Sequence, residues 1–338
     1  MQLNDHHRYI SIDDLVNIIT GNVNTSPDFI EYAYRRISIY TKLNTYNTYK
    51  YAIDKLVAFN KSKTLPFTDI TKHYLNTFIS NLQQHSISNT TISIYIRSLK
   101  SLYNDAIDEF NRDGQDDVIR HNPFLKLKIP RSEPSHRALS VEGLRYIANY
   151  RSSNFRTQMA VDMFMLSFMC GGLNTIDLFN MPVQASRIEI KRTKTENDIS
   201  IHITPEMRRI FDVYAGKTHM LRFCETRERT NTTAHTRYYN EYSNVQAWGR
   251  AINDELQTIA KTEIEQNNNI MPENITMYYA RHSFATIAMQ IGISADHIAL
   301  CLAHSQGEQN KVTWGYIEKR NSVVDDAIRK VIDFIYYS

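Results

Sequence analysis

The chain has 338 residues, of which 42% are hydrophobic and 22% are charged. This length suggests about two domains, and the composition is that of an ordinary globular protein. The three cysteines lack CxxC spacing, which excludes a disulfide framework or a cysteine-based zinc site. No run approaches the ~20 apolar residues that a membrane span needs, and the N-terminal residues lack the apolar core of a signal peptide. We therefore expect a cytoplasmic protein.

The net charge of +3 does not by itself indicate a nucleic-acid-binding protein. The basic residues are nevertheless concentrated in two segments, 120–137 and 187–194, with only Glu133 and Glu189 as acids. Such clusters can neutralise phosphates, although solvated loops have the same composition. The basic residues in the two segments are Arg120, Lys126, Lys128, Arg131, Arg137, Arg187, Lys191, Arg192 and Lys194.

The first half of the chain has helical periodicity and no strand pattern. Residues 1–25 form a polar lead with a helical patch at 12–19, and apolar residues then recur at helical spacing through 26–112. Four short helices in this range predict a compact all-α bundle. Residues 113–138 are polar and then punctuated by prolines, as is typical of an extended linker.

The second half has a different pattern. Residues 159–170 are apolar nearly all round, which predicts a helix at the centre of a core that ends at Gly171 and Gly172. Alternating isoleucines at 188–203 predict a β-hairpin around a turn at 195–198. Residues 217–245 are polar and have the composition of an insertion or long loop, whereas 322–336 form an amphipathic helix.

Three short motifs near the C-terminus carry chemically useful side chains. They are Tyr278-Tyr279-Ala280-Arg281-His282-Ser283-Phe284-Ala285-Thr286, Leu302-Ala303-His304-Ser305 and Val312-Thr313-Trp314-Gly315-Tyr316-Ile317. In their order and spacing these motifs resemble those of the tyrosine recombinase (phage integrase) family. The resemblance covers roughly residues 26–336 and is carried mainly by 138–320. It implies a mainly α protein, with an N-terminal helical core-binding (SAM-like) bundle and an α+β catalytic domain that contains a small β-sheet or hairpin.

The resemblance also assigns roles. Tyr316 would attack a DNA phosphate and become linked to the 3′ end, while Arg281 would bind the non-bridging oxygens. His304 would hydrogen-bond the phosphate or move the proton of the nucleophile, and Lys194, on the hairpin, would protonate the departing 5′-oxygen. No metal or cofactor is required when arginine and lysine supply the positive charge. Each residue also has a purely structural alternative. Tyr316 could be an ordinary core or surface residue, Arg281 a partner in a buried ion pair, and Lys194 a solvated turn residue. His282 is expected to be a packing residue.

Two positions depart from the family pattern. Asn174 stands where the family has an arginine, in Gly172-Leu173-Asn174-Thr175-Ile176-Asp177, and it could simply cap the following helix. Tyr278 replaces a histidine, although a phenol can still donate to a phosphate oxygen. We expect another cation, Arg192 or Arg187, to reach the phosphate. In lacking the arginine at position 174, the chain resembles a branch of integrases from conjugative transposons of gut anaerobes, some of which lack it too.

In the family, the bundle and the catalytic domain close around the duplex as a clamp joined by a basic linker. The resemblance thus implies double-stranded DNA as partner, a homotetramer on synapsed DNA, a monomer or weak oligomer in free solution, and a nucleoid-associated location. It also allows a host DNA-bending accessory protein. The residues expected to contact DNA are Arg97, Lys100, Lys126, Lys128, Arg131, Arg187 and Arg192.

The resulting hypothesis is a site-specific recombinase, an integrase or invertase. Its rivals are a catalytically impaired homologue that regulates through DNA binding, a type IB topoisomerase and a helical adaptor. The expected domains are a lead (1–25), a core-binding domain (26–112), a linker (113–138), a catalytic domain (139–320) and a C-terminal helix (321–338) that is exchanged between protomers.

Overall fold

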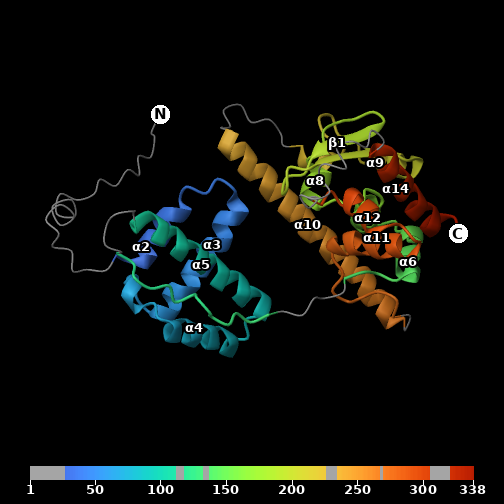
Figure 1. Ribbon diagram of the computed structural model, residues 1–338. Helices are drawn as coiled ribbons and strands as arrows, with labels where there is room; N and C mark the ends of the chain where they lie inside the picture. Colours follow the sequence, from blue (N-terminus) through green and yellow to red (C-terminus); the bar gives the residue numbers. More distant parts are fainter. Residues whose placement is uncertain (1–26, 112–117, 132–136, 226–233, 267–268, 305–319) are drawn as a thin grey trace. The chain divides into compact units, whose positions relative to one another are not determined.

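The computed structural model describes residues 27–111, 118–131, 137–225, 234–266, 269–304 and 320–338 (Figure 1). The chain divides into two compact units, Met1–Pro134 and Ser135–Ser338, called unit 1 and unit 2 below. The described residues are mostly helical, with a two-stranded antiparallel sheet in unit 2. The predicted fold class, a helical bundle followed by an α+β domain with a small hairpin, is confirmed.

Unit 1 is a helical bundle closed around an aromatic core. Side-chain caps fix where several helices begin, because Asp28, Thr71 and Ser88 each accept a hydrogen bond from a backbone N–H of the first turn. Phe29, Phe67 and Tyr103 are fully buried, and their rings contact one another. The helical elements are α2 (Phe29–Ile37), α3 (Leu43–Asn60), the 3-10 turn η1 (Phe67–Asp69), α4 (Lys72–Gln84) and α5 (Asn89–Phe110).

Part of the segment expected to be an extended linker packs on unit 1. Ile119 and Phe124 are buried in the core of the bundle. The Asn111 side chain exchanges two hydrogen bonds with the backbone of Ile119, which fixes the return of the chain after α5. Two apolar side chains between polar and proline residues are enough to draw this segment onto the core, so 118–129 is part of the bundle.

Unit 2 is organised around α7. This helix is buried on nearly all sides, and it contacts α6, α9, α10 and α11. Asn154 caps its N-terminus through the backbone N–H groups of Arg156 and Thr157. The elements are α6 (Val141–Asn149), α7 (Phe155–Met169), α8 (Thr175–Phe179), β1 (Arg187–Lys191), β2 (Asp198–His202), α9 (Pro205–Val213), η2 (Arg222–Cys224), α10 (Ala234–Glu265), α11 (Tyr278–Gln290), α12 (Ala295–Cys301) and α14 (Arg320–Tyr336).

The hairpin pairs β1 with β2 in the antiparallel register Ile188↔Ile201 and Ile190↔Ile199. Asp198 pairs with Lys191 and therefore belongs to β2, so the turn comprises residues 192–197 and begins earlier than expected. The backbone bonds between Arg192 and both Asn197 and Glu196 close this longer turn. The sheet pairing buries Ile188, Ile199 and Ile201 in the unit 2 core.

The expectation of a long loop at 217–245 is wrong in its second half, because α10 begins at Ala234. Its buried apolar residues, Val245, Ile252, Leu256 and Ile259, recur at helical spacing. The residues of α10 before Val245 are mostly polar, which is why composition alone predicted a loop there. In Figure 1, α10 is the long helix that runs along one side of unit 2.

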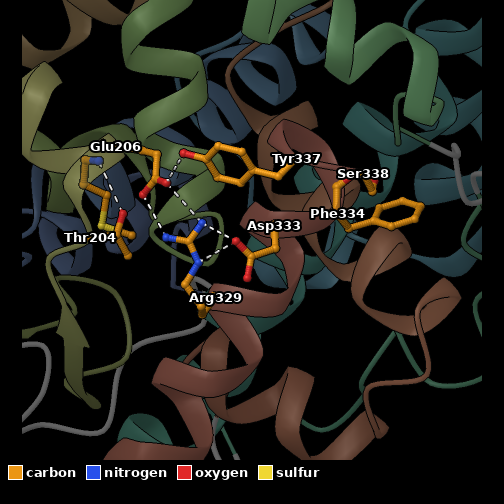
Figure 2. A network of polar contacts seen from close by, with 8 residues as sticks. Thr204, Glu206, Arg329, Asp333, Phe334, Tyr337 and Ser338 are labelled. Carbon is orange, nitrogen blue, oxygen red and sulfur yellow. Dashed lines mark hydrogen bonds and ion pairs between the residues drawn. The ribbon is translucent and has the colours of Figure 1, made fainter.

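The C-terminal helix α14 packs on its own unit. It buries Val324, Ile328, Val331 and Ile332 in the unit 2 core, against α6, α11, α12 and β2. A polar network then fastens its last turns to α9 (Figure 2): Arg329 bonds to both carboxylate oxygens of Glu206 at 2.9 and 3.1 Å, and the Tyr337 hydroxyl donates to Glu206 at 2.7 Å. Exchange between protomers, as expected from the sequence, would require α14 to leave these contacts.

Candidate functional site

Arg281 is held at the start of α11 by the chain reversal that follows α7. Gly172 has φ +71°, and a Cβ at that position would lie 2.4 Å from the Cα of Arg281. Only glycine therefore allows the two backbones to approach so closely. The carbonyl oxygen of Gly172 accepts a hydrogen bond from Nη1 of Arg281 at 3.1 Å. The glycine that ends α7 thus also positions the predicted phosphate-binding arginine.

A second arginine reaches the same place. Nη2 of Arg281 donates to the carbonyl oxygen of Leu302 at 2.7 Å, and Nη1 of Arg192 donates to the same oxygen at 2.9 Å. The residue Arg192 is only 4% exposed. Two guanidinium groups, one from α11 and one from the hairpin, therefore meet at a single oxygen atom.

The carboxylate of Asp177 attaches the hairpin to this site. Its Oδ1 accepts the backbone N–H of Thr193 at 2.8 Å, and its Oδ2 lies 3.5 Å from Nε of Arg192, an ion pair between two buried side chains. Asp177 lies on α8, one turn after Asn174. Asn174 occupies the N-cap position of α8, yet its side chain makes no capping hydrogen bond. The capping role considered for Asn174 is therefore absent.

His304 follows a strained turn at the end of α12. Ala303 has φ +46°, the left-handed region that non-glycine residues seldom adopt, and its carbonyl oxygen accepts a hydrogen bond from Nδ2 of Asn197 at 3.0 Å. This bond ties the hairpin turn to the His304 turn. Partial burial, together with the charges of Arg281 and Arg192, lowers the pKa of His304. A neutral imidazole, able to accept a proton, is favoured as a result.

The pKa of Arg281 is also perturbed. Burial and the neighbouring charge of Arg192 lower it to about 10. Arg281 therefore remains protonated at neutral pH, but its charge is poorly solvated and repelled by a second cation. Such a pair is poised to bind an anion.

Lys194 and Tyr278 are accessible to solvent. Lys194 lies in the exposed hairpin turn between Arg192 and Asn197. Tyr278 is 47% exposed, and its ring stands edge-on to that of His282, with the centroids 4.8 Å apart. Burial and the charges of Arg137 and Arg281 lower the pKa of His282. The packing of His282 against Tyr278 agrees with its expected role as a packing residue.

Arg187 does not join the two arginines at Leu302. It forms a bidentate ion pair with Asp325 of α14, at 2.7 and 3.2 Å, and its Nε donates to Ser200. Of the two hairpin arginines, Arg192 lies beside Arg281, whereas Arg187 pairs with α14. Opposite charge on α14, which the sequence does not connect to the hairpin, explains the difference.

The remaining residues predicted from the sequence are Tyr316 and five cations of unit 1. Tyr316 lies outside the described residues, as does the whole of the lead 1–25. In unit 1, Arg97, Lys126, Lys128 and Arg131 are exposed, and Lys100 is half-buried. Their expected contacts with DNA stay predictions. Sequence reasoning missed Asn197 and the Leu302 carbonyl, because neither a turn amide nor a backbone oxygen has a motif of its own.

The described parts of the chain contain neither a cluster of metal-ligating side chains nor a membrane-spanning helix. No group of three or more His, Cys, Asp or Glu side chains there could hold a metal ion. No helix among these residues combines the length and apolar character needed to cross a membrane.

Comparisons with known proteins agree with this architecture. Residues 28–129 match the family described as phage integrase SAM-like domain. No curated protein matches the chain. The Tn1549 transposon integrase in complex with transposon right end DNA is similar in structure, at 14% identity and a TM-score of 0.58, over 92% of this chain and 96% of that chain.

Lambda integrase structures are similar to the same degree. A tetramer bound to a Holliday junction aligns over 90% of this chain and 84% of that chain, with 15% identity and a TM-score of 0.56. A dimer bound to a COC′ core site aligns over 94% and 84%, with 15% identity and a TM-score of 0.55. At such identities the likeness shows a shared fold.

Proposed function

We propose that the chain is a site-specific DNA recombinase that breaks and rejoins DNA through a 3′-phosphotyrosyl intermediate. The observation that carries the proposal is the convergence of Arg281, Arg192 and the His304 turn at Leu302. Guanidinium groups are suited to a phosphate because they stay charged and donate parallel hydrogen bonds. The likeness of the fold to integrases that were solved with DNA supports the same function.

The proposed reaction uses four side chains. The phenol oxygen of Tyr316 attacks the phosphorus and forms a new P–O bond, while the bond to the 5′-oxygen breaks and its electron pair leaves with that oxygen. His304, neutral because its pKa is lowered, takes the phenol proton. Lys194 delivers a proton to the 5′-oxygen. The arginines offset the negative charge that builds up on the phosphorane.

Rejoining reverses these steps with a different strand. A 5′-hydroxyl attacks the phosphotyrosine and restores the tyrosine, so the phosphodiester bond energy is retained and no cofactor is consumed. We propose that exchange occurs in a homotetramer on synapsed DNA, as in the lambda integrase complex on a Holliday junction. A host DNA-bending protein would assist, and the free chain would be a monomer or weak oligomer in the nucleoid.

Unit 1 would provide the second half of a clamp around the duplex. The cations proposed to contact phosphates are Arg97 and Lys100 on α5, and Lys126, Lys128 and Arg131 after it. Contacts of this kind position the protein and make its affinity fall with salt, because counterions are released. The resemblance of the Asn174 departure to integrases of conjugative transposons favours an element-mobilising role, as integrase or invertase.

A catalytically impaired regulator is the second candidate, because Asn174 removes one preorganised charge, which can lower a rate by about 10²–10³ when nothing replaces it. The buried charge of Arg192 beside Arg281 argues against an impaired site.

Covalent trapping tests the proposal. Nicked duplexes with a randomised centre lose the 5′-hydroxyl strand after cleavage, so a cleaving protein accumulates as a covalent adduct that survives denaturation. We expect the wild type to form the adduct with a recurring sequence, and Arg281→Ala to form at least about 100-fold less in the same time. DNA binding by the wild type without any adduct would instead identify the regulator.

A further inference from the structure

We propose that Arg192 is the second phosphate-binding arginine of this site and replaces the charge that is missing at Asn174. This proposal rests on the proposed function, since it assigns a residue to the same reaction. It concerns a hairpin residue, whereas the lost arginine would have stood at the start of α8.

The first support is the shared acceptor. The Leu302 carbonyl oxygen receives Nη1 of Arg192 and Nη2 of Arg281, so both guanidinium groups contact one atom. A non-bridging phosphate oxygen is an acceptor of the same kind, with more negative charge. A phosphate beside Leu302 would lie next to both cations.

The second support is donor capacity. A guanidinium has five N–H donors, and the bonds within the described residues use two of them on each arginine. The remaining donors of Arg192 and Arg281 are enough for a bidentate phosphate contact. The Leu302 carbonyl would keep the two planar groups oriented while the phosphate binds.

The third support is the acid that accompanies Arg192. Asp177 lies one turn after Asn174, at the position where the family resemblance predicts an acid. Its carboxylate accepts a hydrogen bond from the backbone N–H of Thr193 at 2.8 Å and lies 3.5 Å from Nε of Arg192. Asp177 is therefore a positioning residue for Arg192, and it compensates only part of the buried positive charge of the two arginines. Burial lowers the pKa of Arg281, and the neighbouring charge of Arg192 lowers it further.

The alternative is that Arg192 merely clamps the Leu302 turn. Charge on the DNA distinguishes the two roles. Replacing a non-bridging oxygen of the scissile phosphate by a methyl group gives a neutral methylphosphonate. An arginine that acts by neutralising charge contributes little to the cleavage rate on this substrate. A clamping arginine would matter equally on both substrates.

The experiment measures first-turnover cleavage of the nicked duplex selected by the wild type, with either a phosphate or a methylphosphonate at the scissile position. We expect Arg192→Ala to reduce the rate on phosphate about 10²–10³-fold, and to reduce it less than about 10-fold on methylphosphonate. Arg151→Ala is the matched control, because Arg151 also donates to backbone carbonyls of unit 2 but lies at the end of α6. Its rates should equal those of the wild type on both substrates.

Thermal unfolding of each variant shows whether it folds. If Arg192→Ala does not, Arg192→Gln serves in its place, because it removes the charge but keeps an N–H donor for the Leu302 carbonyl; a loss confined to the phosphate substrate is again expected. An equal loss on both substrates, or no loss on phosphate, would overturn the proposal for Arg192. Failure of the wild type to cleave any duplex would overturn the proposed function itself, which is a distinguishable result.

Discussion

Gly172 shows how a residue without a side chain can determine the position of a charged one. Its φ of +71° and the 2.4 Å separation between its ideal Cβ and the Cα of Arg281 are two independent reasons why only glycine fits. The sequence predicted the glycine as the end of a helix. Its contact with α11 could not be predicted, because it joins residues more than a hundred positions apart.

Gly172→Ala is therefore expected to lower the free energy of unfolding by about 2–4 kcal/mol, the sum of left-handed strain and a forced backbone shift. Gly292→Ala is the matched control: φ is +83° there, but nothing lies within 4 Å of the added Cβ, so only the strain of about 1 kcal/mol remains. Chemical denaturation measures both. Equal losses would mean that the close approach to Arg281 has no energetic consequence.

His304 makes a prediction about pH. Burial and the two arginines lower its pKa from 6.5, so the imidazole stays neutral to a lower pH than an ordinary histidine. If neutral His304 accepts the phenol proton, the rate of first-turnover cleavage should begin to fall only below pH 6.5. His304→Gln should be slower and lose this acidic limb. If the rate falls already at or above pH 6.5, or if the same fall persists in His304→Gln, the titrating group is not His304.

At the scale of elements, local periodicity predicted the elements with strong patterns. The helices of unit 1, the buried helix α7 and the hairpin have clear apolar repeats of 3.6 or 2 residues. The segment around Ile119 and Phe124 lacked such a repeat, and tertiary contacts with the bundle, rather than local propensity, decide its structure. The start of α10 is mostly polar, so composition alone predicted a loop there.

The attachment of α14 to α9 is an element-scale feature with a measurable energy. Burial raises the pKa of Glu206, but hydrogen bonds from Arg329 and Tyr337 outweigh it and lower the pKa to about 2 from an ordinary 4.5. A carboxyl group whose pKa is lower in the folded state than in the unfolded state stabilises the fold at pH values above the unfolded-state pKa. That stability is lost as the pH falls from 4.5 toward 2.

We expect Glu206→Gln to lower the free energy of unfolding by roughly 2–3 kcal/mol at neutral pH and to abolish most of the acid-dependent loss. Asp326→Asn, which removes an exposed carboxylate from α14, is the control and should change little. Denaturant titrations at several pH values between neutrality and about pH 3 measure both effects. An acid profile of Glu206→Gln identical to that of the wild type would refute the coupling.

At the scale of the whole molecule, the order of the motifs predicted which side chains could form one site. The packing of the fold determines which of them are brought together. Arg281, His304 and the hairpin come from distant segments, yet bonds to Gly172, Leu302 and Ala303 connect them. The choice between Arg192 and Arg187 could not be made from the sequence. It depends on Asp177 and Asp325, which are brought to the hairpin only by the fold.

In the proposed reaction, a tyrosine of this chain becomes covalently attached to DNA beside these arginines. Peptide mapping of the trapped adduct by mass spectrometry tests it most directly. The nucleotide should be carried by Tyr316, and Tyr316→Phe should form no adduct while it still binds the duplex. An adduct on any other residue, or an undiminished adduct with Tyr316→Phe, would contradict it.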